Sequence, residues 1–214
     1  MPNPQVIREK YCITASGYDE LYAEEQLRKY DVVFRAHTPS GTLLDIGAGT
    51  CLLLEYLVAR RKHLKVKYYI ALDLTPCMLG LCRRRVEALK LGYLVDIVEA
   101  EASHLPLRDN SVDESYAFTV FDLLYKPEKG IAEQVRVTRR IPVYTLLHRV
   151  EASRRFSLCG ASIGATDKDV ICLPRASYKV YYDTSIGGYE GGEGQRFALT
   201  TPYIPDLRRN PKRV

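Results

Sequence analysis

The chain has 214 residues, of which 46% are hydrophobic and 27% charged, and its formal net charge is +5 at pH 7. These proportions are typical of one globular domain with a buried core, and the mild positive charge permits a nucleic-acid partner without demanding one. No segment reaches the roughly 18 to 20 consecutive apolar residues of a membrane span, and the first residues lack the apolar stretch of a signal peptide. We therefore expect a soluble cytoplasmic protein that does not contact a membrane.

Six cysteines are spread along the chain. No CxxC pair is followed by a second pair, which argues against a zinc ribbon, and we expect no metal site. In a reducing compartment these residues are interpreted as free thiols that mostly fill the core as small apolar side chains. They are Cys12, Cys51, Cys77, Cys82, Cys159 and Cys172.

The first 17 residues show little pattern, and we expect an irregular arm followed by one or two helices between residues 18 and 37. From residue 42 onward, apolar strand-like runs alternate with helix-like stretches, and Thr75 and Pro76 suit the start of one of these helices. The alternation predicts an α/β fold with a doubly wound, mostly parallel sheet. Strands are expected over residues 42–47, 68–72, 94–98, 112–120, 141–147 and 169–173, and helices over 52–60, 76–91, 128–139 and 151–159.

The C-terminal segment has a different composition. Residues 187–194 contain five glycines in eight positions, residues 177–183 are rich in tyrosine, and the chain ends in a basic, proline-broken stretch. This tail is either a flexible extension or an arm that folds on a partner, such as a second copy of the chain in a homodimer.

The most informative stretch runs from Leu43 to Cys51 and reads LLDIGAGTC. An apolar strand delivers Asp45 and the glycines Gly47 and Gly49 to a turn that opens a helix. Glycine lets the backbone approach a ligand closely, and amides at a helix N-terminus suit an anionic group. The pattern indicates a nucleotide-type loop, although an ordinary glycine-containing turn would share it.

Acidic residues also follow the next two predicted strands. Asp73 ends the second strand, where its carboxylate can accept hydrogen bonds from ribose hydroxyls. Glu101 and Ala102 follow the third strand, where a carboxylate can receive an adenine amino group. Three successive strand ends therefore present ligand-type residues at one edge of the predicted sheet.

These features resemble the class I S-adenosylmethionine-dependent methyltransferases, especially their small single-domain members. The resemblance covers about residues 18–150 and rests on LLDIGAGT, ALDLTPCML, EAEASHLPLRDNSVDE and YDELY. It implies a Rossmann-like methyltransferase fold, S-adenosylmethionine as cofactor and methyl transfer as activity. It also implies the cofactor-binding positions: Asp45, Gly47, Ala48 and Gly49 at the methionine end, Asp73 and Leu74 at the ribose, Glu101 and the Ala102 amide at the adenine, and Tyr18 or Tyr22 as a cover.

We expect the chain to divide into an N-terminal arm and helical segment (1–41), a cofactor-binding core (42–175) and the glycine- and tyrosine-rich extension (176–214). One residue departs from the family pattern. Cys51 stands where the family often has a third glycine, and its side chain is expected to narrow the space beside the helix start.

Two other functions compete with this interpretation. A nicotinamide-dependent oxidoreductase would use the GxGxxG/A fingerprint, but Leu52 occupies the place of its last small residue. A methyltransferase-like module that binds RNA or a protein partner would use the basic clusters around residues 60–67, 83–85, 139–140 and 208–213, although such runs are usually solvated surface.

The methyl acceptor is not identified by the sequence, and a small metabolite is slightly favoured over RNA or protein. The Asn/Asp-Pro-Pro-Tyr signature of amino-group methylation is absent after the fourth predicted strand. Candidates for proton transfer are Asp122, which could equally cap a helix, and His104 and His148, which lie on the expected functional edge.

Overall fold

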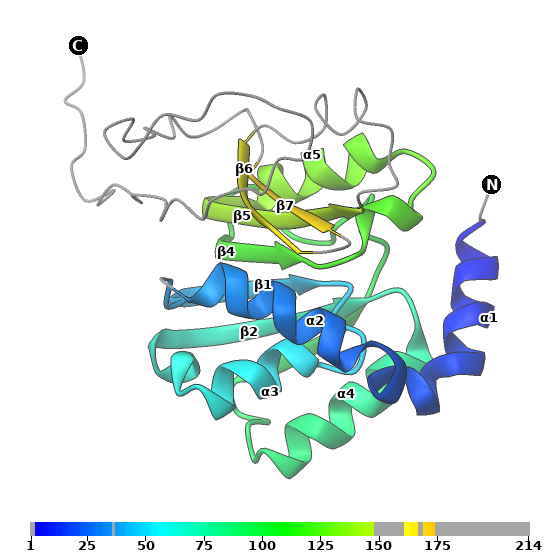
Figure 1. Ribbon diagram of the computed structural model, residues 1–214, viewed down its shortest axis with the longest axis horizontal. Helices are drawn as coiled ribbons and strands as arrows, with labels where there is room; N and C mark the ends of the chain where they lie inside the picture. The colour runs from blue at the N-terminus through cyan, green and yellow to red at the C-terminus, as the bar shows by residue number, and fades with distance from the viewer. Residues whose placement is uncertain (1–2, 36, 148–160, 167–168, 174–214) are drawn as a thin grey trace.

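A computed structural model describes residues 3–35, 37–147, 161–166 and 169–173 of the chain. Its centre is one seven-stranded sheet with the strand order β3-β2-β1-β4-β5-β7-β6 (Figure 1). The strands are β1 (Gly41–Ile46), β2 (Val66–Asp73), β3 (Val95–Glu99), β4 (Val112–Ala117), β5 (Thr138–Leu147), β6 (Ala161–Ala165) and β7 (Asp169–Leu173).

The pairing of the strands confirms the predicted doubly wound, mostly parallel sheet. Strands β1 to β5 pair in parallel, whereas β7 pairs antiparallel with both β5 and β6. A dinucleotide-binding sheet of the Rossmann type has the order 3-2-1-4-5-6. The insertion of β7 between β5 and β6 therefore distinguishes this sheet from that of the nicotinamide alternative.

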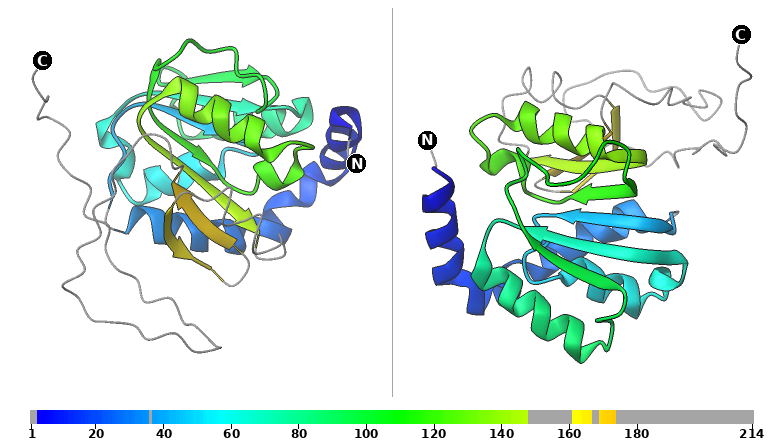
Figure 2. Two further views of the ribbon diagram at one scale, coloured as in Figure 1. Left: turned by 90° about the horizontal axis from the view of Figure 1, so that it is seen from above. Right: turned by 180° about the vertical axis from the view of Figure 1, so that it is seen from behind.

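Helices cover both faces of the sheet, as the two further views in Figure 2 show. On one face lie α2 (Tyr18–Phe34), α3 (Leu52–Ala59) and α4 (Pro76–Ala88), and on the other lies α5 (Pro127–Val137). Short 3-10 helices complete the connections: η1 (Ala15–Gly17), η2 (Lys62–Lys65) and η3 (Phe121–Leu123).

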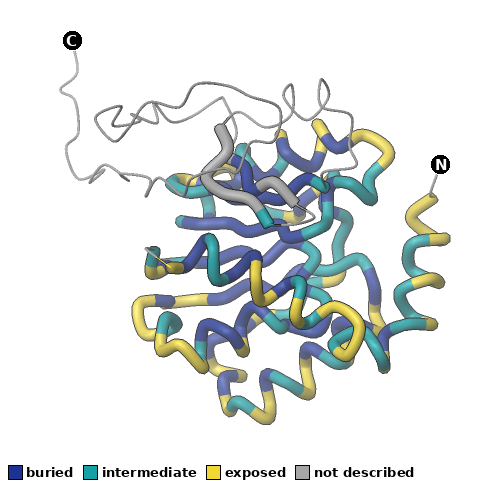
Figure 3. The backbone as a smooth tube through the Cα atoms, viewed as in Figure 1, coloured by how far each residue is buried: buried dark blue, intermediate teal, exposed yellow. Residues whose placement is uncertain are grey.

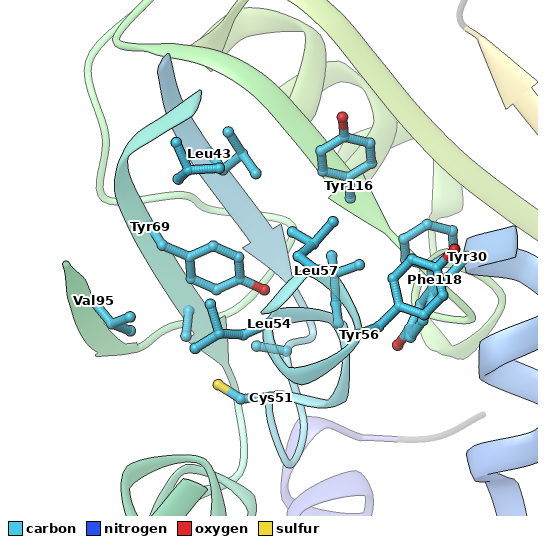
Figure 4. Packing of buried hydrophobic residues seen from close by; sticks show 14 of the residues in the cluster. Tyr30, Leu43, Cys51, Leu54, Tyr56, Leu57, Tyr69, Val95, Tyr116 and Phe118 are labelled. Atoms are coloured by element: carbon cyan, nitrogen blue, oxygen red, sulfur yellow. The ribbon is translucent and has the colours of Figure 1, made fainter. Parts of the chain in front are cut away.

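Successive strand residues enter two separate cores because side chains alternate across a sheet. Leu43 and Tyr69 pack under α2, α3 and α4, while their neighbours Leu44 and Ile70 join the core under α5. The larger core holds a group of aromatic rings, and the rings of Tyr30 and Phe118 lie 4.8 Å apart (Figure 4). Each strand end is thus fixed in position by two packed layers.

The expectation of an irregular N-terminal arm is wrong. Residues Pro4–Thr14 form helix α1, which begins with Pro4 in its first turn and with the Asn3 side chain accepting a hydrogen bond from the Gln5 N–H at 3.0 Å. Proline and an Asn cap are both favoured at a helix start. Helix α1 has no buried residue, in contrast to the strands of the sheet (Figure 3).

Other details of the elements also differ from the sequence prediction. Strand β4 ends at Ala117, three residues earlier than expected, and Thr119 just beyond it has a left-handed φ of 58°. Thr75 precedes α4 as expected, but its side chain makes no capping hydrogen bond. Strand β6 was not anticipated, and the helix expected over residues 151–159 lies outside the described residues. Within those residues, no helix is both long and apolar enough to cross a bilayer.

The interpretation of the cysteines as free thiols is also wrong. Disulfides join Cys12 to Cys77 and Cys51 to Cys82, and Cys172 is disulfide-bonded as well. None of the described cysteines is free. Spacing does not reveal such pairings, and their presence removes the argument for a reducing compartment.

The Cys51–Cys82 disulfide ties α3 to α4 across the larger core, where both residues are fully buried. Cys51 has a left-handed φ of 62°, a conformation that favours the glycine the family often has there. Its sulfur is bonded to Cys82, and Cys51 does not line the cleft described below. The expectation that its side chain narrows the ligand space is therefore not met.

We expect the double variant Cys51→Ala with Cys82→Ala to lose about 2–4 kcal/mol of unfolding free energy, since a native disulfide restricts the unfolded chain. Cys51→Gly with Cys82→Ala should lose roughly 1 kcal/mol less, because glycine adopts the left-handed conformation without strain. Urea unfolding of both variants measures this difference. Equal stabilities of the two variants would contradict the assignment of strain to position 51.

Candidate functional site

A cleft opens at the edge where the parallel strands end. The loops after β1, β2, β3 and β4 form its floor and sides, and α1 and Tyr18 form the remaining wall. Its lining residues are Ile7, Tyr11, Tyr18, Gly47, Gly49, Leu72, Asp73, Leu74, Thr75, Met78, Ala100, Glu101, Ala102, Phe118, Thr119, Val120, Leu123 and Leu124. The carboxyl edge of an open α/β sheet is the usual place for a ligand.

Most of the expected cofactor-binding residues meet in this cleft. Those that line it are Tyr18, Gly47, Gly49, Asp73, Leu74, Glu101 and Ala102, whereas Tyr22, Asp45 and Ala48 do not. The structure therefore brings together residues from three strand ends and from the N-terminal segment.

The loop between β1 and α3 presents bare backbone to the cleft. Gly47 and Gly49 have left-handed φ values of 69° and 53°. A Cβ at Gly47 would lie 2.4 Å from Val120 Cγ2, whereas a Cβ at Gly49 would meet nothing closer than 3.9 Å. The space beside Gly49 is thus open to a ligand. The Ala48 N–H instead donates to the Leu72 carbonyl at 2.9 Å and holds the loop to β2.

Asp73 connects two loops of the cleft. Its Oδ2 accepts from the Gly49 N–H at 2.9 Å, and its Oδ1 accepts from the Thr75 N–H at 2.8 Å. Burial raises the pKa of Asp73, and these N–H donors lower it in part. A carboxylate has about four acceptor positions, so Asp73 retains capacity to accept hydrogen bonds from ligand hydroxyls.

Glu101 lies on the loop after β3 and takes part in a short polar chain. Its Oε1 accepts from the Ser103 hydroxyl, and Ser103 Oγ lies 2.9 Å from His104 Nδ1. His104 is exposed and does not line the cleft. These contacts link the side chains of His104, Ser103 and Glu101 in sequence.

Asp45 lies below the cleft in the larger core. Its side chain is only 4% exposed, and Tyr69 donates its hydroxyl proton to Oδ2 at 2.6 Å. Burial raises the pKa of Asp45 from 3.8 to about 7, although the hydrogen bond from Tyr69 lowers it. Asp45 therefore contacts the strand framework and does not face the cleft directly.

The N-terminal segment supplies part of the wall that the sequence did not reveal. Ile7 and Tyr11 of α1 line the cleft, and they share one face of the helix because they are four residues apart. The Tyr11 ring lies 6.2 Å from that of Tyr18, which lies 4.9 Å from that of Tyr22. Burial raises the pKa of Tyr18 well above its ordinary value, so its hydroxyl stays protonated.

The backbone conformation of Thr119, in the candidate segment after β4, is a second feature that the sequence does not predict. A left-handed φ in a β-branched residue is uncommon and costs energy. Its N–H donates to Thr145 Oγ1 at 2.8 Å, and its own Oγ1 accepts from Lys29 Nζ. Lys29 is fully buried and pairs with Glu25 at 2.9 Å. These contacts from α2 and β5 hold Thr119 in its strained position on the cleft wall.

Of the proton-transfer candidates, neither Asp122 nor His104 lines the cleft. The Asp122 carboxylate accepts from the Leu147 N–H at 3.1 Å and ties the loop after β4 to the end of β5. It does not cap η3, whose N-cap is Val120. His104 lies outside the lining, and His148 lies outside the described residues.

We expect Asp45→Asn to change how stability depends on pH. Below pH 4 the Asp45 carboxyl is protonated in both the folded and the unfolded chain. Because burial raises its pKa from 3.8 to about 7, the wild-type chain should lose stability as the pH rises between these values. At about 1.4 kcal/mol for each pH unit, this loss of stability is on the order of a few kcal/mol. The Asp45→Asn variant should not show this loss, because the Asn side chain does not ionise.

Thermal melting at pH 5 and pH 8 measures the effect, and Asp45→Asn should gain stability relative to wild type at the higher pH. Asp96→Asn is the matched control, since Asp96 also accepts from a tyrosine hydroxyl, that of Tyr68, but is exposed. Its effect should stay within about 0.5 kcal/mol at both pH values. Parallel pH profiles for wild type and Asp45→Asn would contradict this account of Asp45.

Comparison with known proteins agrees with this geometry. Residues 44–141 match the family model of a methyltransferase domain, a region that begins in β1 and ends in β5 and includes every loop of the cleft except α1 and Tyr18. No curated protein matches the sequence.

Solved structures share the fold at low sequence identity. A methyltransferase from Aquifex aeolicus described as S-adenosylmethionine-dependent is 20% identical with a TM-score of 0.53, and the match covers 81% of this chain and 100% of that one. The cyclase SpnF is 20% identical with a TM-score of 0.60 over 71% of this chain and 63% of its own. A methyltransferase of Methanococcus maripaludis, described as putative, is 18% identical with a TM-score of 0.53 over 63% and 62% of the two chains.

The chain therefore covers less than two thirds of the length of SpnF and of the Methanococcus protein. At these identities the likeness establishes the fold alone. The match to a methyltransferase domain covers residues 44–141, somewhat less than half of the chain, and together with the shared fold it is consistent with the class I S-adenosylmethionine-dependent methyltransferase superfamily.

Proposed function

We propose that this protein binds S-adenosylmethionine in the cleft and transfers its methyl group to a small molecule. The observation that carries the proposal is the meeting of Asp73 and Glu101 with the bare backbone of Gly47 and Gly49 in one cleft at the carboxyl edge of the sheet. Carboxylates that accept hydrogen bonds beside an open glycine loop suit an adenosyl ligand.

In this proposal each strand end has a separate role. Asp73 accepts hydrogen bonds from the ribose hydroxyls, with Leu74 packed beside the sugar. Glu101 and the Ala102 amide bind the adenine. The backbone at Gly47, Ala48 and Gly49 accommodates the methionine end, Asp45 supports that loop from the core below, and Tyr18 with Tyr22 covers the ligand.

S-adenosylmethionine supplies a methyl group on a sulfonium that already contains its leaving group. The task of the chain is therefore to align the acceptor and to exclude water. The wall after β4 is suited to this task, because Phe118, Val120 and Leu124 are apolar and Thr119 is held in place by contacts from two other elements. No proton-transfer role is needed from Asp122, which the end of β5 already engages.

The acceptor is proposed to be a small molecule because two of the basic clusters lie away from the cleft and because of the side chains that line it. The run around residues 60–67 leads into β2, and Arg139 and Arg140 lie at the start of β5, so both clusters are at the amino edge of the sheet, opposite the cleft. Arg140 donates to the Ser40 carbonyl at 2.7 Å and to Glu114 at 3.0 Å, which gives it a structural role. The cleft itself is lined mainly by apolar and aromatic side chains, as small-molecule sites usually are.

Calorimetry with S-adenosylhomocysteine tests the binding part of the proposal. The wild-type chain should bind, and Asp73→Ala should weaken binding about 10- to 100-fold, the range for losing charged hydrogen bonds. Asp73→Asn should weaken it less, because the amide oxygen still accepts one ribose hydroxyl. Thermal melting of each variant verifies that it is folded.

Asp109→Ala is the matched control, because Asp109 is an exposed carboxylate that pairs with Arg136 and does not line the cleft. The affinity of the Asp109→Ala variant for S-adenosylhomocysteine should equal that of the wild-type chain. If calorimetry on the folded protein shows no heat of binding with either S-adenosylmethionine or S-adenosylhomocysteine, the proposal is contradicted. Binding unchanged in Asp73→Ala would mean that the ribose lies elsewhere.

The transfer step needs its own test, since one protein with this fold is described as a cyclase. Labelled methyl groups from the cofactor should appear in a metabolite fraction incubated with the enzyme. Incorporation into RNA or protein fractions alone would contradict the small-molecule assignment and favour the alternative acceptors.

A further inference from the structure

Helix α1 forms part of the cleft wall but is weakly attached to the rest of the molecule. It contains no buried residue, and its apolar side chains Val6 and Ile13 are 54% and 81% exposed. It packs against α4 and η1 and stands beside the main body at the N-terminal end of the chain (Figure 1). Its place over the cleft therefore does not come from burial in a hydrophobic core.

The polar contacts of Arg8 that hold α1 to the described core are partly open to solvent. Arg8 donates to the Leu74 carbonyl at 3.0 Å and pairs with Glu99, but the Arg8 and Glu99 side chains are 36% and 43% exposed. Exposed ion pairs contribute little to stability because water and salt screen them. The ring contact of Tyr11 with Tyr18 adds one more attachment, inside the cleft.

A covalent attachment of α1 is the disulfide between Cys12 and Cys77. Cys12 directly follows Tyr11, which lines the cleft, and Cys77 lies in the first turn of α4, two residues after Thr75, which also lines it. The covalent bond thus joins the helix that closes the cleft to the helix that begins beside Asp73. It keeps the two surfaces at a high effective concentration that their weak contacts would not achieve alone.

The Cys12–Cys77 and Cys51–Cys82 disulfides differ in how far their cysteines are exposed to solvent. Cys51 and Cys82 are fully buried, whereas Cys77 is exposed and Cys12 is half-buried. A thiolate must reach a sulfur atom to reduce a disulfide. A reductant in solution should therefore attack the Cys12–Cys77 bond and leave the Cys51–Cys82 bond intact.

We propose that the Cys12–Cys77 disulfide is a redox-controlled clamp that fixes α1 over the cofactor cleft. A dithiol reductant attacks one sulfur, the S–S bond breaks and the other cysteine leaves as a thiolate. The second thiol of the reductant then resolves the mixed disulfide, so that two electrons pass to the protein, Cys12 and Cys77 become thiols, and the reductant becomes a disulfide. Once the disulfide is reduced, α1 detaches from the body of the protein. The side of the bound ligand that Ile7 and Tyr11 had covered is then exposed to solvent. The identity of that ligand rests on the proposed function.

Hydrogen exchange of residues 4–14 in the full chain, before and after treatment with dithiothreitol under native conditions, tests the clamp directly. Alkylation and mass analysis should find Cys12 and Cys77 modified and Cys51 and Cys82 protected. Exchange in α1 should accelerate about tenfold or more, while exchange in β1 and β4 stays unchanged. Unchanged protection of α1 after proven reduction of this bond would overturn the proposal.

Variants separate the clamp from a general loss of stability. Cys12→Ser should match the reduced wild type and show no further response to dithiothreitol. The double variant Cys51→Ala with Cys82→Ala should keep α1 protected until the reductant is added. Accelerated exchange of α1 in that double variant without reductant would contradict the proposal, because the core disulfide would then be what holds the helix.

Dissociation of S-adenosylhomocysteine supplies the functional measurement. Release should be about tenfold faster from the reduced protein and from Cys12→Ser than from the oxidised wild type. If the oxidised and the reduced protein release S-adenosylhomocysteine at equal rates although reduction exposes α1, then α1 does not cover the ligand, and that part of the proposal is overturned. If the compound binds neither form while reduction still exposes α1, the proposed function fails and the redox-controlled attachment of α1 is supported.

Discussion

The hydrogen bonds of Asp73 to the amides of Gly49 and Thr75 connect the loops after β1 and β2. Withdrawing a carboxylate from water is costly unless it is hydrogen-bonded, so these two donors stabilise Asp73 in its half-buried position. The same contacts fix the glycine loop, which cannot carry a side chain at Gly47 because Val120 lies against it. The shape of the cleft follows from this arrangement, with capacity left on Asp73 for a ligand.

The sequence predicted this part of the structure because the signals are local. An apolar strand that ends in an acidic residue or a glycine can be recognised within ten residues, and the carboxyl ends of parallel strands necessarily meet at one edge. Asp73, Glu101, Gly47 and Gly49 were therefore assigned to one site without knowledge of their contacts. Asp45 follows the same local pattern, yet its side chain enters the core beside Tyr69 and not the cleft.

The parts that were missed depend on contacts between distant residues. Helix α1 was not predicted because its signal is short: Ile7 and Tyr11 lie four residues apart on one face, but none of its residues is buried in a core. Its position depends on a disulfide between residues 65 positions apart, a pairing that cysteine spacing does not specify. Thr119 is likewise held by Lys29, 90 residues earlier in the chain. The wall of the cleft is thus less predictable than its floor.

A crystal structure with S-adenosylhomocysteine bound measures the central claim most directly. The account predicts that the ribose hydroxyls lie within hydrogen-bond distance of the Asp73 carboxylate, that the adenine lies beside Glu101 and Ala102, and that the backbone of Gly49 faces the homocysteine end. A ligand bound at the amino edge of the sheet, or in the cleft without contact to Asp73, would contradict it.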